Sequence, residues 1–335
     1  MDKVPLVLAV VLYVLIYLVR LQQVPVDERV EKNIQLEGLV SLREILDKKF
    51  EQFLPSPQSQ LLSGVVLGQK KDLPPQFRLA LRDTSTLHIV VVSGQNLSMV
   101  AGFFLALSGL IKRKVAIALA FLAIIFYTLL TGAEVPVLRA AIMVSLAFLA
   151  QIFGRQGSSL WVLSLAAGFM LLITPRWLFD LSFQLSFMAT LGLVLVSPIL
   201  LQHLKSLPLI GQDLAVTIGV QLMVIPIIAQ NFHQFSLVSV ITNILVGWTV
   251  PFMMILGTIV LGISFISHSL TIFPAMLVEI LSTYFVYIVT FFGSLPFAWE
   301  YVGEQIWMVW VGYYLILAGI LIALNNINRS SKFML

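Results

Sequence analysis

The sequence predicts an all-α polytopic membrane protein, and composition and hydropathy both point to that class. Of the 335 residues, 59% are hydrophobic and only 11% are charged, and the mean hydropathy is +0.99. Soluble domains average about 25% charged residues. Apolar runs of about 17 to 25 residues each predict a membrane-spanning helix, and about ten such runs follow one another here.

The order of the apolar runs gives the expected spans. They lie near 4–19, 87–111, 115–131, 136–153, 158–174, 182–202, 213–230, 237–262, 270–294 and 306–324. The region 236–269 is too long for one span and contains Pro251 near its middle. We therefore expect a broken helix there, or a span followed by a re-entrant segment, as is typical near a translocation path.

Four regions follow from this pattern: 1–19, 20–86, 87–324 and 325–335. In the first region Lys3 precedes an apolar run, as at the start of a signal peptide. Residues 19–22 offer no small-residue cleavage site, so we expect an uncleaved membrane anchor. The second is an extracytoplasmic amphipathic helical region. Its residues 40–53 predict an amphipathic helix with Phe50 on the apolar side, and 61–67 and 76–81 predict short interfacial helices. The third is the transmembrane domain, and the fourth is a cytoplasmic tail.

Charge sets the expected orientation. The basic residues 112–114 are expected in the cytoplasm, which places both termini inside and 20–86 outside. The net charge of +4 fits an anionic partner and cytoplasmic anchoring equally well, so it decides nothing. The chain has no Cys and four scattered His, which excludes disulfides and the usual metal-ligand spacings, so we expect no metal or cofactor.

Three polar clusters interrupt the apolar segments: 88–98, 132–139 and 180–186. Polar groups at membrane depth are costly unless they face protein or water. Gly, Ser and Asn also favour an opened helix at 93–96. We therefore expect the first cluster to line a cavity, with close helix–helix packing as the alternative for any single residue.

The second and third clusters combine helix starts with an intramembrane charge. Gly132 and Pro136 predict the turn that begins a helix, and Asp180 predicts an N-cap. Arg139 has two open interpretations: a structural lock on Glu134 or a helix C-terminus, or contact with a passing phosphate. The candidate lining residues of the whole chain are His88, Ser93, Gly94, Gln95, Asn96, Ser98, Glu134, Arg139, Gln184, Ser186, Gln221 and Asn243.

Four motifs in this order resemble the competence domain of the ComEC family, bacterial inner-membrane channels that import single-stranded DNA during natural transformation. They are LPSP…LLSGVVLG at 54–68, FRLALRDT…LHIVVVSG at 77–94, GAEVPVLRAAIM at 132–143 and FQLSF at 183–187. The resemblance covers about residues 42–300. Many members have Leu-His where this chain has Gln95-Asn96. The metallo-β-lactamase motif of longer members does not occur in this sequence, so we expect the channel core without nuclease activity.

The resemblance implies a passive DNA conduit in the bacterial inner membrane. Lys70, Lys71, Arg78 and Arg82 are then expected to gather DNA at the outer mouth. The implied partners are single-stranded DNA, an extracytoplasmic DNA receptor, membrane lipid and a cytoplasmic helicase-like motor, because the sequence contains no Walker-type motif. Whether a second copy completes the path is left open.

Two other classes of function remain as alternatives. A secondary transporter of a small anionic or polar solute would use Arg139 as counter-charge, but it predicts an internal repeat that the sequence does not show. An intramembrane hydrolase would use Ser93 as nucleophile. His88, five residues upstream, lies about 140° around an ideal helix from Ser93, so we expect no enzymatic activity.

Overall fold

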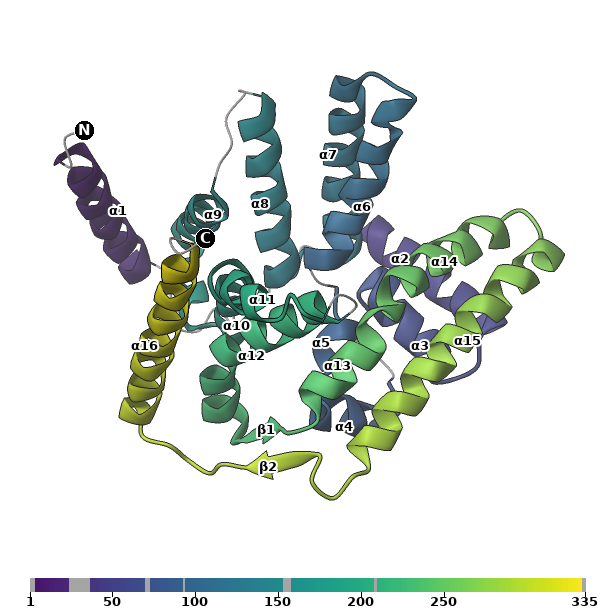
Figure 1. The fold of residues 1–335 in the computed structure, drawn as a ribbon. Coiled ribbons are helices and arrows are strands. Elements are labelled where there is room, and N and C mark those ends of the chain that lie inside the picture. The colour runs from purple at the N-terminus through teal and green to yellow at the C-terminus, as the bar shows by residue number, and fades with distance from the viewer. Residues whose placement is uncertain are drawn as a thin grey trace.

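The computed structural model describes residues 4–23, 37–69, 73–92, 94–152, 158–207 and 210–332. Within these ranges the regular elements are helices apart from one two-stranded ribbon, which confirms the predicted all-α class (Figure 1). Ser93, Lys70 and Lys71 lie outside the described residues.

The first elements are the N-terminal helix α1, which packs on α9, and a group of helices from α2 to α4 that lies apart from it (Figure 1). Helix α1 packs on α9 through the Tyr13 hydroxyl, which donates to the Gly168 carbonyl at 3.2 Å. The predicted amphipathic helix is confirmed as α2, and Phe50 is its buried residue. The segment 61–67 is helical as expected, but its side chains are buried in the core rather than lying on a membrane surface. The bounds are α1 Val4–Gln23, α2 Glu37–Phe53, α3 Gln58–Leu62, the π-helix η1 Ser63–Leu67 and α4 Pro75–Asp83.

The remaining elements alternate long helices with short irregular ones. Their bounds are α5 Leu87–Val90, α6 Gly94–Ala106, η2 Leu107–Gly109, α7 Arg113–Leu130, α8 Val135–Ile152, α9 Ser159–Ile173, η3 Pro175–Phe179, α10 Leu181–Leu191, η4 Gly192–Val196, α11 Ser197–His203, α12 Gly211–Phe232, β1 Gln234–Ser236, α13 Ser239–Gly247, α14 Thr249–Ser264, α15 His268–Gly293, β2 Trp299–Tyr301 and α16 Trp307–Lys332.

The expected number of spans is confirmed only in part. In the described residues, five helices are long and apolar enough to cross a membrane, and six if the bent pair α13–α14 counts as one. The predicted span 87–111 is divided by a break, which leaves α6 with 13 residues. Helix α9 has 15 residues, which is also shorter than a full crossing of about 20 residues.

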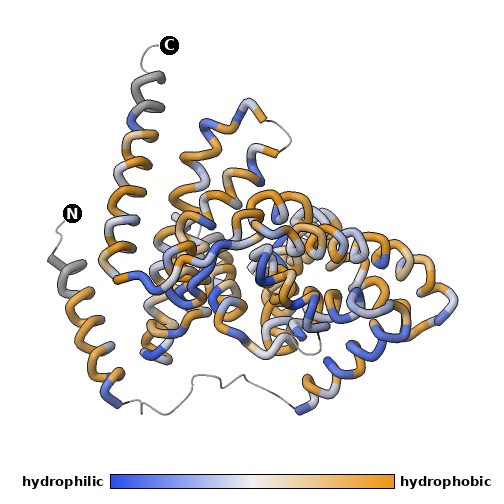
Figure 2. The backbone as a smooth tube through the Cα atoms, turned by 90° about the horizontal axis from the view of Figure 1, so that it is seen from below, coloured by the Kyte–Doolittle hydropathy of each residue, from blue (hydrophilic) through white to orange (hydrophobic). Residues whose placement is uncertain are grey.

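Among the described residues, two apolar clusters hold many of the helices together. The larger one joins α2–α8 to α13–α15, and the smaller one joins α8, α9 and α10. Helices α6 and α7 form one hairpin, and α14 and α15 form another that lies against α2 and α3 (Figure 1). Most of the length of the long helices is hydrophobic (Figure 2), as is expected of helices that meet lipid on one side and protein on the other.

The antiparallel ribbon ties two connections together. Strand β1 follows α12 and pairs with β2, which precedes α16, and Phe235 lies opposite Glu300. The ribbon thereby fixes where α13 begins, which matters because α13 carries part of the site described next.

Candidate polar pocket between two broken helices

The first helix break separates α5 from α6. Helix α5 ends at Val90, Val91 is extended with φ −97° and ψ 136°, and α6 begins at Gly94. The sequence predicts an opening at 93–96, and the structure places it at most two residues earlier. A break of this kind leaves backbone groups that water or other polar groups must satisfy.

Two side chains, one from α6 itself and one from α7, bond the neighbouring segment η1 and hold this break in place. The Asn96 amide donates to the Val65 carbonyl at 2.8 Å, and the Tyr127 hydroxyl donates to the Val66 carbonyl at 3.1 Å. Both acceptors lie in η1, a π-helix, and Asn96 is only 1% exposed. A Cβ on Gly64 of the same π-helix would lie 2.6 Å from the Val90 carbonyl oxygen. The π-helix therefore packs directly on the end of α5 and anchors the start of α6.

The second break separates α13 from α14. The two helices meet at Trp248 with a bend of 40°. This confirms the predicted discontinuity in 236–269, although the break comes three residues before Pro251. The Thr249 hydroxyl donates across it to the Val246 carbonyl at 2.6 Å.

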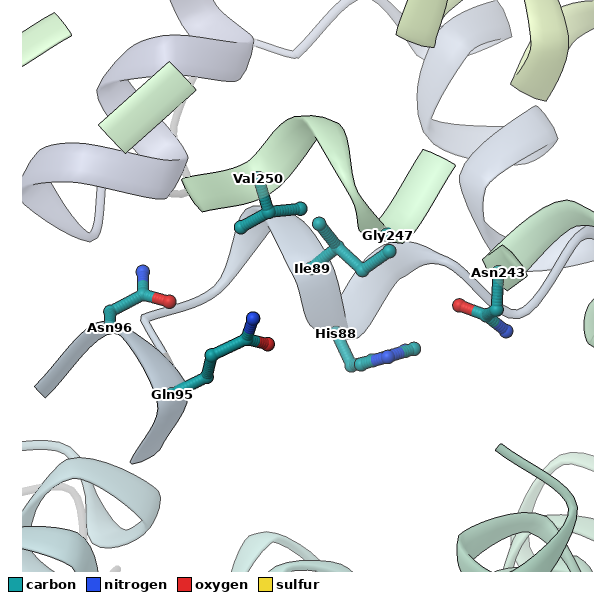
Figure 3. A pocket seen from close by; sticks show the side chains of 7 residues that line it. All are labelled: His88, Ile89, Gln95, Asn96, Asn243, Gly247 and Val250. Atoms are coloured by element: carbon teal, nitrogen blue, oxygen red, sulfur yellow. The ribbon is translucent and has the colours of Figure 1, made fainter. Parts of the chain in front are cut away.

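The two breaks meet at a pocket of about 110 Å³. Its lining comes from α5, α6, α13 and α14, and Figure 3 shows the side chains. The lining residues are His88, Ile89, Gln95, Asn96, Asn243, Gly247 and Val250. Small-molecule sites usually have about 300–1,000 Å³, so this pocket has room for a few water molecules and not for a nucleotide strand.

The polar side chains of the pocket differ in how they are bonded. His88 Nδ1 bonds the Ser85 carbonyl at 2.9 Å, and the Asn243 amide donates to the Ser239 carbonyl at 2.8 Å. No hydrogen bond of the Gln95 amide is found among the described residues. Figure 3 shows the Asn243 oxygen turned toward His88.

Arg139 lies next to the first break but belongs to a different cluster. Its Nε donates to the Ser186 hydroxyl at 2.6 Å, and another guanidinium nitrogen donates to Thr190. The guanidinium also lies 5.9 Å from the centre of the Phe187 ring. A Cβ on Gly94 would lie 3.5 Å from the third guanidinium nitrogen. Arg139 therefore joins α8 to α10 and packs against the first residue of α6.

The predicted alternative in which Arg139 locks onto Glu134 is wrong, because Arg139 bonds the hydroxyls of Ser186 and Thr190 and the sulfur of Met143. Glu134 interacts electrostatically with Arg43, which itself donates to the Leu130 carbonyl at the end of α7. Burial lowers the pKa of Arg43 and Glu134 opposes that shift. Arg43 thus fixes the turn at Gly132, whose φ is +88°, and a Cβ added to Gly132 would lie 3.4 Å from the guanidinium.

The helix starts predicted around these residues are confirmed. Asp180 caps α10, since its carboxylate accepts from the Phe183 amide at 2.8 Å. Pro136 is the second residue of α8, where a missing N–H costs nothing. Asp180 and Pro136 therefore have local structural roles and do not reach the pocket.

The other predicted residues fall into three groups. Ser98 bonds the Gly94 carbonyl of its own helix, and Gln184 donates to the Leu178 carbonyl at 3.0 Å, away from the pocket. Gln221 donates to the Ser239 hydroxyl and so connects α12 to the start of α13. Arg78 and Arg82 are exposed on α4, and Arg82 pairs with Asp83 at 2.9 Å.

Three residues whose contacts support this region are not predicted from the sequence. Thr190 lies four residues after Ser186, so helical spacing alone places both hydroxyls on one face. Ser239 gives no comparable signal. Arg43 falls on the polar side of an amphipathic helix, where a solvated role is the ordinary expectation.

Comparison with known proteins identifies the family. Residues 65–326 match the family model of the competence proteins. The chain belongs to the competence protein family. This match includes both helix breaks, the pocket and Arg139, and it confirms the resemblance drawn from the four motifs.

Three proteins from different bacteria are similar in sequence to this competence-family chain. The chain is 32% identical to ComE operon protein 3 of Bacillus subtilis over 64% of its own length and 27% of that protein. It is 32% identical to an uncharacterized protein of Aquifex aeolicus over 48% of its length and 40% of that protein. It is 26% identical to the uncharacterized protein YcaI of Escherichia coli over 57% of its length and 27% of that protein. The chain thus spans well under half the length of these relatives, and no solved structure matches it.

Proposed function

We propose that this chain forms the membrane core of a channel that carries single-stranded DNA into the cytoplasm during natural transformation. The observation that carries the proposal is the meeting of two broken apolar helices at a polar pocket, in a chain of the competence family. Non-helical backbone at membrane depth is tolerated where it lines a cavity or is buried in protein, and broken helices surround the binding sites of many transporters.

The chemistry of the pocket suits a solute that passes without being held. DNA carries one phosphate charge per nucleotide, and a path rich in Lys and Arg would bind it tightly. The polar residues of the pocket are His88, Gln95, Asn96 and Asn243, and none of the described residues that line it is Lys, Arg, Asp or Glu. Weak contacts of this kind favour conduction over retention.

The pocket must widen before a strand passes. The hinges available for this are the two breaks, at Val91 and at Trp248. Gly247 lines the pocket at the second break, and a Cβ added there would meet no atom within 4 Å. A larger side chain at this position therefore has room at the edge of the pocket.

The same proposal includes the surroundings of the channel. The chain is placed in the bacterial inner membrane with both termini in the cytoplasm and residues 20–86 outside. A DNA receptor delivers the strand outside, where the exposed Arg78 and Arg82 of α4 assist, and a helicase-like motor draws it inward. We assign the chain no enzymatic activity of its own.

Import of labelled DNA tests the proposal directly. In a transformable bacterium that lacks its own channel gene, expression of this chain should restore fluorescent DNA in the cytoplasm. DNA that stays outside, with the chain present in the membrane, would contradict the proposal.

A matched pair of variants tests whether the pocket lies on the path. Gly247→Leu should abolish import by narrowing the pocket. Gly262→Leu should leave it unchanged, because Gly262 lies in α14 away from the pocket and also has open space around it. Equal import by both variants would place the path elsewhere.

A further inference from the structure

Helix α13 forms one wall of the pocket. It supplies two of the lining residues, Asn243 and Gly247. The helix has only nine residues, and it continues into α14 through the bend at Trp248. A change in the angle of this bend would move that wall and change the width of the pocket. The contacts at the two ends of α13 therefore decide whether the pocket stays narrow.

The start of α13 is fixed by several contacts. Gln221 of α12 donates to the Ser239 hydroxyl, and that hydroxyl donates to the Ser236 carbonyl at 3.2 Å. The Leu237 amide donates to the Ala298 carbonyl at 3.0 Å, which joins this start to the residue before β2. Ser239 is only 1% exposed. The start of α13 is therefore held by α12 and by the ribbon together.

One side chain of a neighbouring helix holds the end of α13. The last carbonyls of a helix have no donor within that helix. The Tyr284 hydroxyl of α15, which packs on α13, donates to one of them, the Leu245 carbonyl, at 3.1 Å (Figure 1). The centre of the Tyr284 ring also lies 5.7 Å from the centre of the Trp248 ring. Tyr284 thus contacts both the end of α13 and the bend that follows it.

We infer that Tyr284 is the positioning residue that keeps the pocket narrow, and that the strand passes when the end of α13 leaves Tyr284. The inference rests on the proposed function and adds the side chain that controls the width of the path. One hydrogen bond between neutral groups shifts an equilibrium by only about fivefold, so this contact breaks and re-forms readily. The first break is held more firmly, because Asn96 and Tyr127 both bond η1 there.

A thiol inside the pocket measures how often the pocket opens. The chain has no Cys, so Val250→Cys introduces a single thiol. Val250 lines the pocket and is only 4% exposed, so a water-soluble methanethiosulfonate reagent reaches this thiol when the pocket opens. The rate of modification is measured on the full chain in lipid nanodiscs. We expect Tyr284→Phe to raise this rate about fivefold, the factor that one net hydrogen bond supplies.

Two controls separate the positioning of α13 from the general stability of the fold. Tyr287→Phe removes a hydroxyl from the same helix, at an exposed side chain for which no hydrogen bond is found among the described residues, and it should leave the rate unchanged. Val137→Cys places the thiol in α8, outside the pocket, at a side chain that is 0% exposed. Its rate of modification should be the same with and without Tyr284→Phe.

Two outcomes of the thiol experiment overturn the inference. One is an unchanged rate at Val250→Cys when Tyr284→Phe is introduced. The other is an equal rise of the rate at Val137→Cys, which would show that Tyr284 only stabilises the fold.

The import assay tests whether this contact controls transport. Tyr284→Phe should raise the initial rate of DNA import, by up to about fivefold, because the pocket is open more often. A raised thiol rate with unchanged import would overturn the inference and leave the proposed channel function intact. Failure of the wild-type chain to import DNA would overturn the proposed function, and with it the passage of the strand that the inference invokes.

Discussion

The two helix breaks that meet at the pocket are built differently. At the α5–α6 break the backbone becomes extended at Val91, and the Asn96 side chain anchors the start of α6 to the Val65 carbonyl of η1. At the α13–α14 break Trp248 keeps helical dihedral angles, and the chain only bends by 40°. The first break is thus an opened helix and the second is a bent one.

The difference shows which contacts stabilise each break. The opened helix depends on its neighbours, because the π-helix η1 packs on its end and Arg139 lies against Gly94. The bent helix is supported locally by the Thr249 hydroxyl. Changes at the neighbours of the first break should therefore cost much more stability than changes at the second break.

The largest effect is expected at Gly64, where η1 touches the end of α5. A Cβ there would lie 2.6 Å from the Val90 carbonyl oxygen and would also overlap a Val90 methyl carbon, so Gly64→Ala must displace backbone. Overpacking of this kind costs about 3 kcal/mol. Thermal unfolding of the detergent-solubilised chain measures it. Gly262→Ala is the control, and equal melting temperatures for the two variants would contradict the prediction.

A second effect is expected at Asn96, which ties α6 to η1. Asn96→Leu leaves the buried Val65 carbonyl without its donor, and we expect a loss of about 2 kcal/mol. The same unfolding measurement applies. Ser98→Ala should be nearly neutral, because that hydroxyl bonds only a carbonyl of its own helix. A neutral Asn96→Leu would show that η1 does not hold the first break.

A third effect concerns Arg139 and its hydroxyl partners. Ser186→Ala removes one bond to a charged group, which should cost about 1.5 kcal/mol. Ser145→Ala is the control, since Ser145 bonds a carbonyl of its own helix.

DNA import by Arg139→Ala then separates the two interpretations of Arg139. Lost import with normal folded protein supports a phosphate contact, whereas lost folded protein supports a purely structural role.

The sequence predicts the local features of this fold better than the contacts between distant elements. The Asp180 cap and the opening near Gly94 depend on neighbouring residues, so short stretches of sequence are enough to indicate them. The pairing of Asn96 with Val65 joins residues 31 positions apart, and nothing in either stretch indicates the other.

The residues of the candidate site could also be predicted only in part from the sequence. His88, Gln95, Asn96 and Asn243 are all expected lining residues, and the structure brings these four together. Gln184 belongs to the same expected set but lies elsewhere, because helix packing and not residue type decides which polar side chain faces the pocket. The expected number of spans is confirmed only in part for a related reason, since hydropathy does not indicate a break inside an apolar run.

The smallest effect is expected at Pro251, the residue that first suggests a broken helix. It is the third residue of α14, within the first turn, where a backbone N–H has no partner in the helix. The bend lies three residues earlier and is supported by Thr249, so Pro251→Ala should change stability by less than about 0.5 kcal/mol. The bend itself should persist. Spin labels at the exposed Ile241 and Ile259 report it by electron–electron distance measurement. A longer distance in Pro251→Ala would show that the proline, and not the packing around Trp248, bends the helix.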